Sequence, residues 1–187
     1  LPCSGYIKIN GLDLKKINSL SWQSYISYVG QESFVFSGSI YENIHMYSAN
    51  IDYEWLDKCI KYVNLDKFIN SLDKGGETMI GEGFRKISGG QMQKLNIARA
   101  LYRNPKLLIL DEATSNQDIE NEEIIINLIN KLKGNITIIV VAHRLNSITS
   151  ADNIFLFKNG RIIENGKHSK LLAHKKEYWK MWNSYQR

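Results

Sequence analysis

The sequence has few cysteines and no long apolar run, and each absence excludes a class of protein. Cys3 and Cys59 are its two cysteines, there is no Cys-x-x-Cys pair, and the four histidines are scattered. Neither a disulfide framework nor a Cys/His metal site is therefore expected. The longest apolar run, 136–142, is interrupted by Thr137 and is far shorter than the roughly 20 residues of a membrane-spanning helix. With no signal-peptide pattern at its start, the chain is expected to be reduced and cytosolic.

Dense runs of basic residues are also missing, although the formal net charge is +5. Such an excess can indicate a nucleic-acid partner or an anionic membrane surface. The nearest candidates, Lys15-Lys16 and Lys175-Lys176, are explained by solvated helix faces, so we predict no nucleic-acid partner. The length suits one domain, and a chain that is 43% hydrophobic and 23% charged is ordinary for a soluble globular protein.

The apolar segments predict an α/β fold. The stretch 107–110 is short and fully apolar, which indicates a central parallel strand buried on both faces. A helix is expected over 119–132, because acidic residues load its first turn and Lys131 stands near its end. A second apolar strand follows over 138–142. Strand, helix and strand at this spacing predict a right-handed parallel crossover.

Local signals predict the elements on either side. Asn10-Gly11 and Asn159-Gly160 are tight-turn pairs, and each predicts a β-hairpin. Asp52 is expected to cap the start of a helix. The Ser-x-x-Gln spacing at 88–91 predicts a capping box ahead of another helix. An amphipathic helix is expected from Ser169 onward.

Two acidic residues, Asp111 and Glu112, come directly after the apolar run 107–110. Ligands of open parallel sheets bind outside the carboxyl ends of the strands. An Asp at that edge can hold Mg²⁺, directly or through water, and a neighbouring Glu can orient and deprotonate an attacking water. The alternative is that the pair only caps the next helix.

Other polar residues stand where a phosphate or a water could be contacted. Ser88-Gly89-Gly90-Gln91 opens a helix; its glycines allow a phosphate to approach, and its free N–H groups favour an anion. An ordinary helix cap has the same pattern. His143 follows the second apolar strand and is either a hydrogen-bond partner of a phosphate or structural. Gln31 follows the strand-like stretch 27–30 and either contacts a metal or water or is a loop residue.

Together and in this order, these segments resemble the nucleotide-binding domain of exporter-type ABC transporters. The resemblance places the Walker B strand and catalytic glutamate at 107–112, the signature motif at 88–91, the D-loop at 115–118, the switch histidine at His143 and the Q-loop at Gln31, with exporter-like segments at 36–44, 81–83 and 164–172. It implies an α/β, P-loop NTPase-like ABC ATPase core with a mostly parallel sheet, a helical signature subdomain at about 52–103 and an antiparallel hairpin. Residues 1–187 would then be part of one such domain.

The resemblance also implies ligands, partners and residue roles. It assigns catalysis to Glu112 and His143, ATP contacts to Gln31, Ser88, Gly89, Gly90, Gln91 and Asp118, and Mg²⁺ to Asp111 and Gln31. It implies a head-to-tail dimer with a second nucleotide-binding domain, expected to be identical, and contact with transmembrane domains at the cytoplasmic face of a cell membrane. ATP binding and hydrolysis would there power export or flipping of a substrate.

The sequence departs from the family pattern in places. The glycine-rich loop with Lys and Ser/Thr, expected before Ser4-Gly5, is not present, nor is the upstream aromatic that stacks on adenine. We therefore expect the chain to be a fragment with little ATPase activity of its own. Asn116-Gln117 and Met92 replace commoner residues. One alternative is a soluble ABC-type ATPase acting on nucleic acid or ribosomes, against which the exporter-like segments argue. Another is a module that does not hydrolyse ATP, against which Asp111-Glu112 argues.

Overall fold

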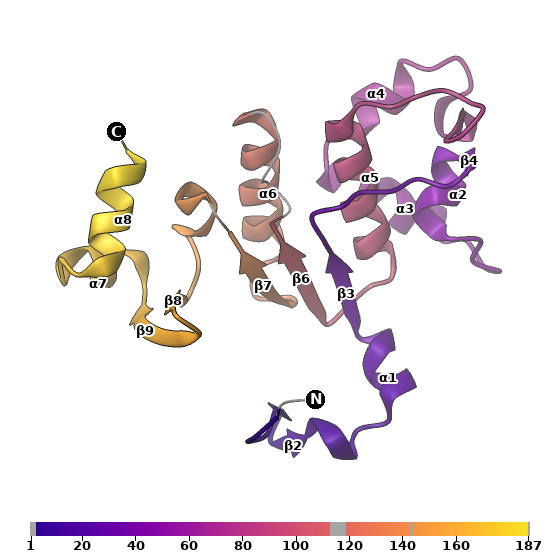
Figure 1. The fold of residues 1–187 in the computed structure, drawn as a ribbon. Coiled ribbons are helices and arrows are strands. Elements are labelled where there is room, and N and C mark those ends of the chain that lie inside the picture. The colour runs from indigo at the N-terminus through magenta and orange to yellow at the C-terminus, as the bar shows by residue number, and fades with distance from the viewer. Residues whose placement is uncertain (1–2, 113–118, 143, 187) are drawn as a thin grey trace.

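A parallel sheet of three strands lies at the centre of the part of the chain that the structure describes (Figure 1). Strand β6 (Leu107–Asp111) lies between β3 (Ile26–Val29) and β7 (Thr137–Val141), and both neighbours run parallel to it. The connection from β6 to β7 contains α6 (Ile119–Leu132). The α/β class and the parallel strand–helix–strand unit predicted from the sequence are confirmed.

The other helices and strands precede, separate or follow the three sheet strands in the sequence. The structure, a computed structural model, describes residues 3–112, 119–142 and 144–186. The other strands are β1 (Lys8–Ile9), β2 (Leu12–Asp13), β4 (Gly38–Ser39), β5 (Met79–Ile80), β8 (Ile154–Lys158) and β9 (Arg161–Gly166). The other α-helices are α1 (Ser19–Ser24), α2 (Ile40–His45), α3 (Tyr53–Tyr62), α4 (Asp66–Asn70), α5 (Gly89–Tyr102), α7 (His168–Ala173) and α8 (Glu177–Tyr185). Short 3-10 helices cover Leu14–Lys16, Gly75–Glu77 and Leu145–Ile148.

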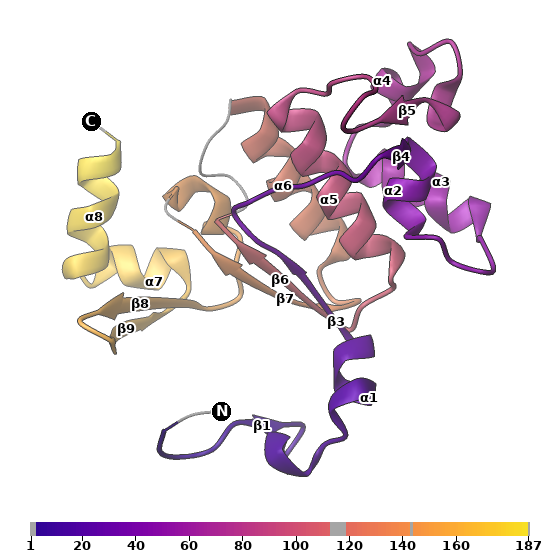
Figure 2. The same ribbon diagram turned by 45° about the vertical axis from the view of Figure 1, so that its right-hand side comes forward.

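The two faces of the sheet differ in how well they are covered. Leu108 and Leu110 have no exposed surface and pack into the main core with residues of α5 and α6, which lie on the same side of the sheet (Figure 2). On the other face Tyr28, Ile139 and Val141 are 60%, 47% and 48% exposed. The prediction of a strand buried on both faces is therefore wrong for the described residues, because alternate side chains of β6 are only half-buried.

Helices α2 to α5 form a group beside the sheet (Figure 1). Helix α3 begins after Asp52, whose side chain accepts a hydrogen bond from the Trp55 N–H at 2.9 Å, as predicted. Cys59 on this helix is fully buried, and burial raises the pKa of its thiol to about 12. It therefore packs as a neutral apolar residue. The group includes most of the expected helical subdomain, about 52–103, whose limits stay a prediction.

The chain begins and ends with hairpins and helices outside the sheet. Both hairpins are present as predicted, β1 with β2 and β8 with β9, and each turns at its Asn-Gly pair. The single helix expected from Ser169 onward is wrong, because α7 and α8 are separate. Lys175 between them has φ of +52°, a left-handed conformation that an α-helix cannot continue through. Among the described helices, none is long and apolar enough to cross a membrane.

Arg99 is a buried cation that ties the segment after β3 to α2 and α5. Its side chain is 8% exposed and donates to the Asn43 carbonyl at 2.7 Å, to the Phe34 carbonyl at 3.3 Å and to Asn96 Oδ1 at 2.7 Å. A further hydrogen bond reaches Asn43 Oδ1 at 3.1 Å. The guanidinium also lies over the rings of Phe34 and Phe36, 4.6 and 5.6 Å from their centroids. One side chain thus holds three separate segments together.

Replacing Arg99 by Leu is expected to destabilise the fold by about 2–4 kcal/mol, because several buried acceptors lose their donor at once. Arg103→Leu is the matched control. Arg103 is exposed at the end of the same helix and donates to the Gln23 carbonyl at 3.3 Å, so its loss should change stability by no more than about 0.5 kcal/mol. Urea unfolding measures both. Equal effects would show that the buried contacts of Arg99 do not stabilise the fold.

Candidate functional site

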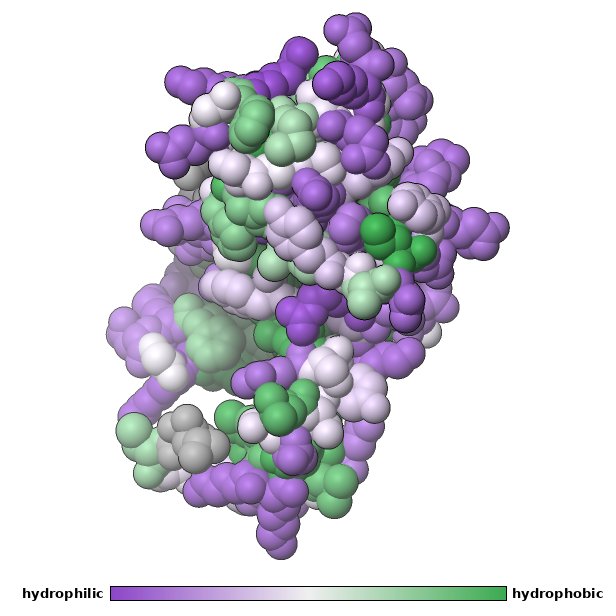
Figure 3. Space-filling model, turned by 90° about the vertical axis from the view of Figure 1, so that its right-hand side faces the viewer, coloured by the Kyte–Doolittle hydropathy of each residue, from purple (hydrophilic) through white to green (hydrophobic). Residues whose placement is uncertain are grey.

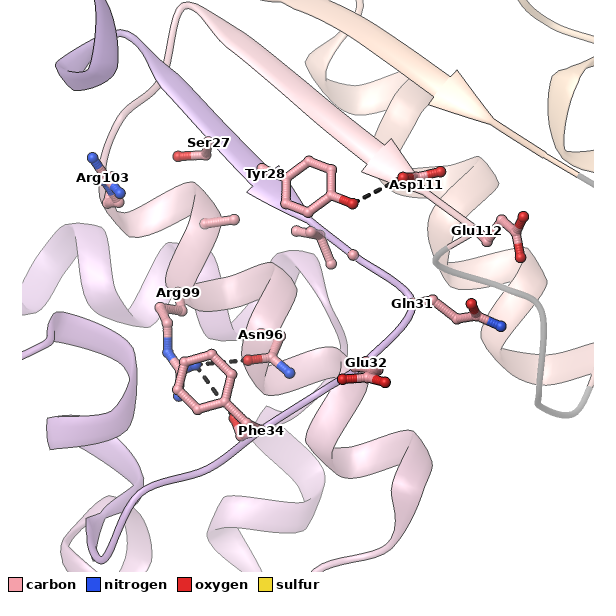
Figure 4. A pocket seen from close by; sticks show the side chains of 13 residues that line it. Ser27, Tyr28, Gln31, Glu32, Phe34, Asn96, Arg99, Arg103, Asp111 and Glu112 are labelled. Atoms are coloured by element: carbon pink, nitrogen blue, oxygen red, sulfur yellow. Dashed lines mark hydrogen bonds between the residues drawn. The ribbon is translucent and has the colours of Figure 1, made fainter. Parts of the chain in front are cut away.

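A cavity of about 550 Å³ runs along β3 to the carboxyl ends of β3 and β6 (Figure 4). Its volume lies in the range of small-molecule sites, roughly 300–1,000 Å³. The lining comes from β3, the loop after it, α5 and the end of β6: Ser27, Tyr28, Val29, Gly30, Gln31, Glu32, Phe34, Asn96, Arg99, Ala100, Arg103, Asp111 and Glu112. Because this is the edge at which open parallel sheets bind ligands, the cavity is the candidate site.

Asp111 and Glu112 lie at the end of the central strand. Strand β6 ends at Asp111, and Glu112 has φ of +51°, in the left-handed region that side chains rarely adopt. The Glu112 N–H donates to the Val141 carbonyl at 2.9 Å, which ties this turn to the end of β7. Such strain costs about 1–3 kcal/mol and gathers at functional sites. This turn brings both side chains to the cavity.

Gln31 reaches the same end of the cavity from the neighbouring strand. Val29 is paired with Leu110 in the parallel register, so the residues that follow β3 and β6 emerge side by side. Gln31 is exposed and lines the cavity with Asp111 and Glu112, as Figure 4 shows. Three residues that the sequence singled out separately thus meet at one place.

Tyr28 belongs to this group, although the sequence did not single it out. Its hydroxyl donates to Asp111 Oδ2 at 2.8 Å. The hydrogen bond to the Asp111 carboxylate is the main reason that the pKa of the Tyr28 hydroxyl is raised above its ordinary value, with burial and the carboxylate charge adding to it. The hydroxyl therefore stays protonated and remains a donor. Tyr28 and Asp111 are 83 positions apart, so only the strand pairing reveals the contact.

The opposite end of the cavity is basic and aromatic. Arg99 and Arg103 line it from α5 and its end, and Phe34 lines it from the loop after β3. Figure 4 shows these side chains away from Asp111 and Glu112. No sequence pattern singled out these arginines, because isolated arginines in a helical pattern fit a solvated face equally well. The cavity thus has Asp111 and Glu112 at one end and two arginines at the other, with Glu32 between them.

The predicted phosphate-binding turn at 88–91 lies at the start of α5, and none of its residues lines the cavity. Ser88 Oγ accepts the Gln91 N–H at 3.2 Å, and Gln91 Oε1 accepts the Ser88 N–H at 2.9 Å, which is the predicted capping box. Ser88 and Gly89 are exposed. Since Ser88 Oγ uses a lone pair in this bond, its hydroxyl proton remains for another partner. The helix start therefore presents donors to solvent.

Two side chains at this end of the cavity, Asp111 and Gln31, carry oxygens that could coordinate Mg²⁺. Asp111 offers a carboxylate and Gln31 an amide oxygen, and both are hard ligands of the kind Mg²⁺ takes. Among the described residues, no group of three or more His, Cys, Asp or Glu side chains could hold a metal ion. Asp111 and Gln31 could supply one or two of the oxygens around such an ion, with phosphates and water completing its shell. Two other predicted site residues, Asp118 and His143, lie outside the described residues.

The exporter-like segments 36–44 and 81–83 lie side by side. Strands β4 and β5 pair antiparallel, and the Ser37 hydroxyl donates to the Glu82 carbonyl at 3.2 Å. Gly81 has φ of +102°, and a Cβ there would lie 2.9 Å from the Phe36 carbonyl oxygen, so only glycine suits this approach. The exposed apolar side chains on these segments and next to them are Phe34, Met46, Tyr47, Met79 and Phe84.

Comparison with known sequences shows similarity to ABC transporters. The profile of the ABC transporter family matches residues 1–115. The chain is 40% identical over 185 residues to the ABC multidrug transporter MDR1 of Cryptococcus neoformans, covering 96% of this chain and 13% of that protein. It is 42% identical over 175 residues to the putative multidrug export ATP-binding/permease protein YgaD of Bacillus subtilis, covering 94% of this chain and 30% of that protein.

Comparison with solved structures agrees with the sequence comparison. The fold is similar to that of a bacterial Atm1-family ABC exporter solved with ATP bound, with a TM-score of 0.88 and 33% sequence identity. The match covers 98% of this chain and 32% of the exporter chain. The predicted ABC ATPase fold is thereby confirmed. The chain spans less than a third of each of these three proteins.

Proposed function

Because the chain belongs to the ABC transporter family, we propose that it is part of the nucleotide-binding domain of an exporter. It binds ATP with Mg²⁺ and takes part in its hydrolysis, which powers export or flipping of a substrate across a membrane. The observation that carries the proposal is the meeting of Gln31, Asp111 and Glu112 at the carboxyl edge of a parallel sheet. The multidrug and exporter names of the relatives favour it over a soluble ATPase acting on nucleic acid or ribosomes.

Each residue at this edge of the sheet has its own role in ATP hydrolysis. Glu112 orients the attacking water and accepts its proton. Asp111 would hold Mg²⁺ directly or through water, and Gln31 would contact the same ion or the water. Bound there, Mg²⁺ would neutralise charge on the phosphates during transfer. His143, after β7, is assigned to the γ-phosphate, and Asp118 to the nucleotide.

The turn at the start of α5 contacts the ATP of a partner domain through Ser88, Gly89, Gly90 and Gln91. Two features support this: the turn is exposed at the start of a 14-residue helix, and it lies apart from the cavity that Asp111 and Glu112 line. A helix start with a free hydroxyl proton suits a phosphate that arrives from outside the domain. Two identical domains packed head to tail would present each turn to the other's nucleotide, and closure would bury both sites.

The transmembrane domains of the same transporter dock on the side formed by segments 36–44 and 81–83. The chain would then lie at the cytoplasmic face of a cell membrane. Figure 3 views the molecule from the side on which α2 to α5 lie, and apolar side chains there form patches between hydrophilic ones. Exposed aromatic and methionine side chains are typical of protein–protein contacts. Phe34 is three positions after Gln31 in the loop that follows β3, so movement of a docked helix against Phe34 would reach the segment that carries Gln31.

The proposal is tested by comparing the full-length protein with the 187-residue chain. In lipid vesicles the full-length protein should hydrolyse ATP when Mg²⁺ is present. The chain alone should bind Mg-ATP weakly and hydrolyse almost none, since its sequence includes no glycine-rich loop with a phosphate-binding lysine. Phosphate release measures hydrolysis, and calorimetric titration measures binding.

Two outcomes would contradict these expectations. Micromolar binding of Mg-ATP by the isolated chain would show that its own residues suffice as a nucleotide site, and the expectation that it holds only part of that site would be wrong. A full-length protein that stays in solution without membranes, and whose ATPase activity responds to nucleic acid or ribosomes, would support the soluble alternative.

A further inference from the structure

Tyr28 makes a contact that the proposed function leaves unexplained. We propose that Tyr28 is a positioning residue, whose hydroxyl holds the Asp111 carboxylate in the orientation that binds Mg²⁺ together with ATP. The carrying observation is the 2.8 Å hydrogen bond from the Tyr28 hydroxyl to Asp111 Oδ2. The inference rests on the proposed role of Asp111 and adds a residue from a different strand to that site.

The register of the sheet explains how the two side chains meet. Tyr28 is paired with Ile109 across β3 and β6, so Asp111 is its diagonal neighbour two positions further along. Alternate residues of a strand share a face, and diagonal neighbours on one face are within reach of aromatic side chains. Figure 4 shows the Tyr28 ring directed toward the carboxyl end of β6, with its hydroxyl at Asp111.

Gly30 provides the space that this ring position needs. It follows Tyr28 by two residues, and a Cβ at Gly30 would lie 2.9 Å from Tyr28 Cε1 and 3.2 Å from the Tyr28 hydroxyl oxygen. The φ angle of Gly30 is outside the left-handed region, so its backbone does not itself require glycine. The ring requires it: a methyl group there would push the hydroxyl away from Asp111.

A fixed carboxylate binds an ion more tightly than a free one. The terminal torsion of an Asp side chain is broad, and a hydrogen bond to Oδ2 selects one orientation while leaving Oδ1 for the ion. Hydrogen bonds to metal-ligating carboxylates contribute about 10–100-fold to metal affinity or activity. We expect the contribution of this single hydrogen bond at the lower end of that range, about 10-fold.

The experiment uses Mn²⁺ as the probe ion on the full-length protein with ATP, followed by electron paramagnetic resonance. Tyr28→Phe keeps the ring and removes the donor, and it should weaken Mn²⁺ binding about 10-fold. Its affinity for ATP measured in EDTA should stay at the wild-type value. Weaker Mn²⁺ binding with an unchanged affinity for ATP distinguishes positioning of Asp111 from a general structural effect. Tyr53→Phe, on an exposed tyrosine of α3, is the control and should match the wild type.

A second variant reaches the same contact by another route. Gly30→Ala keeps the Tyr28 hydroxyl but displaces the ring that carries it. It should therefore weaken Mn²⁺ binding to a similar extent. Because both changes break one contact, the Tyr28→Phe/Gly30→Ala double variant should bind Mn²⁺ no more weakly than either single variant. Additive losses would show that Gly30 acts through something other than the Tyr28 ring.

Asp111→Asn separates failure of this inference from failure of the proposed function. If Asp111→Asn does not weaken Mn²⁺ binding, Asp111 is not the ion's ligand, and the proposed site itself is wrong. If Asp111→Asn weakens it while Tyr28→Phe does not, the site stands and the role of Tyr28 is overturned. Tighter Mn²⁺ binding in Tyr28→Phe would also overturn it, because the hydroxyl would then compete with the ion for the carboxylate.

Discussion

Glu112→Gln in the full-length protein is expected to lower ATP turnover by about 10²–10⁴-fold, the usual contribution of a general base. The amide has the shape of the carboxylate but cannot accept the proton of the attacking water. The turn at φ +51° and the 2.9 Å bond from residue 112 to the Val141 carbonyl involve only backbone atoms, so the site should keep its form. ATP should still bind, and the dimer should accumulate closed around it.

Steady-state phosphate release measures ATP turnover. The amount of ATP retained after gel filtration measures ATP binding. Glu32→Gln is the matched control, since Glu32 is another glutamate that lines the same cavity but is given no role in the reaction. Turnover near the wild-type rate in Glu112→Gln would exclude Glu112 as the base. A large loss in Glu32→Gln and not in Glu112→Gln would assign that role to the loop after β3.

Ser88→Arg in one half of a dimer with two distinguishable halves is expected to abolish nucleotide trapping at one site only. The long side chain would occupy the place where a phosphate approaches the start of α5. If the turn acts on the partner's nucleotide, the lost site is the one whose Asp111 and Glu112 belong to the unaltered half. The site formed by the mutated half's own carboxylates should still close against an intact Ser88.

Site-specific trapping with a photoreactive ATP analogue distinguishes the two sites. Ser88→Ala in the same half is the control for helix stability, because it removes the hydrogen bond from the Gln91 N–H at about 1 kcal/mol without adding bulk. It should reduce trapping less than Ser88→Arg. Loss confined to the mutated half's own carboxylate site would mean that Ser88-Gly89-Gly90 binds phosphate within its own domain, and the head-to-tail arrangement would be wrong.

The elements that the sequence predicted correctly are those with local causes. The capping box at 88–91, the N-cap Asp52 and the Asn-Gly hairpins each depend on residues only a few positions apart. The order Leu107 to Glu112 also predicted a ligand site at a strand end, because that rule requires only a parallel sheet. Gln31, Asp111 and Glu112 were singled out separately, and the strand pairing of the structure brings them to one cavity.

Contacts between distant residues could not be predicted in the same way. The hydrogen bond between Tyr28 and Asp111 needs the order and register of the strands, which no short segment contains. Two of the acceptors around Arg99 are backbone carbonyls, which leave no mark in the sequence, and two are amide oxygens of Asn43 and Asn96. The division of the C-terminal helix depends on a single left-handed residue, Lys175, a type that does not favour this conformation.

The pairing of β3 with β6 also sets the order in which the domain can fold. The residues joined across these strands by the Tyr28–Asp111 bond are 83 positions apart, and helices α2 to α5 lie between them in the chain. At about 5–20 residues per second of synthesis, β3 waits on the order of ten seconds for its partner strand to be made. During that time the helices can already pack through their nearer contacts, whereas the open edge of β3 needs protection from wrong pairing. A ribosome-bound chain is therefore most exposed to aggregation just before Leu107 emerges.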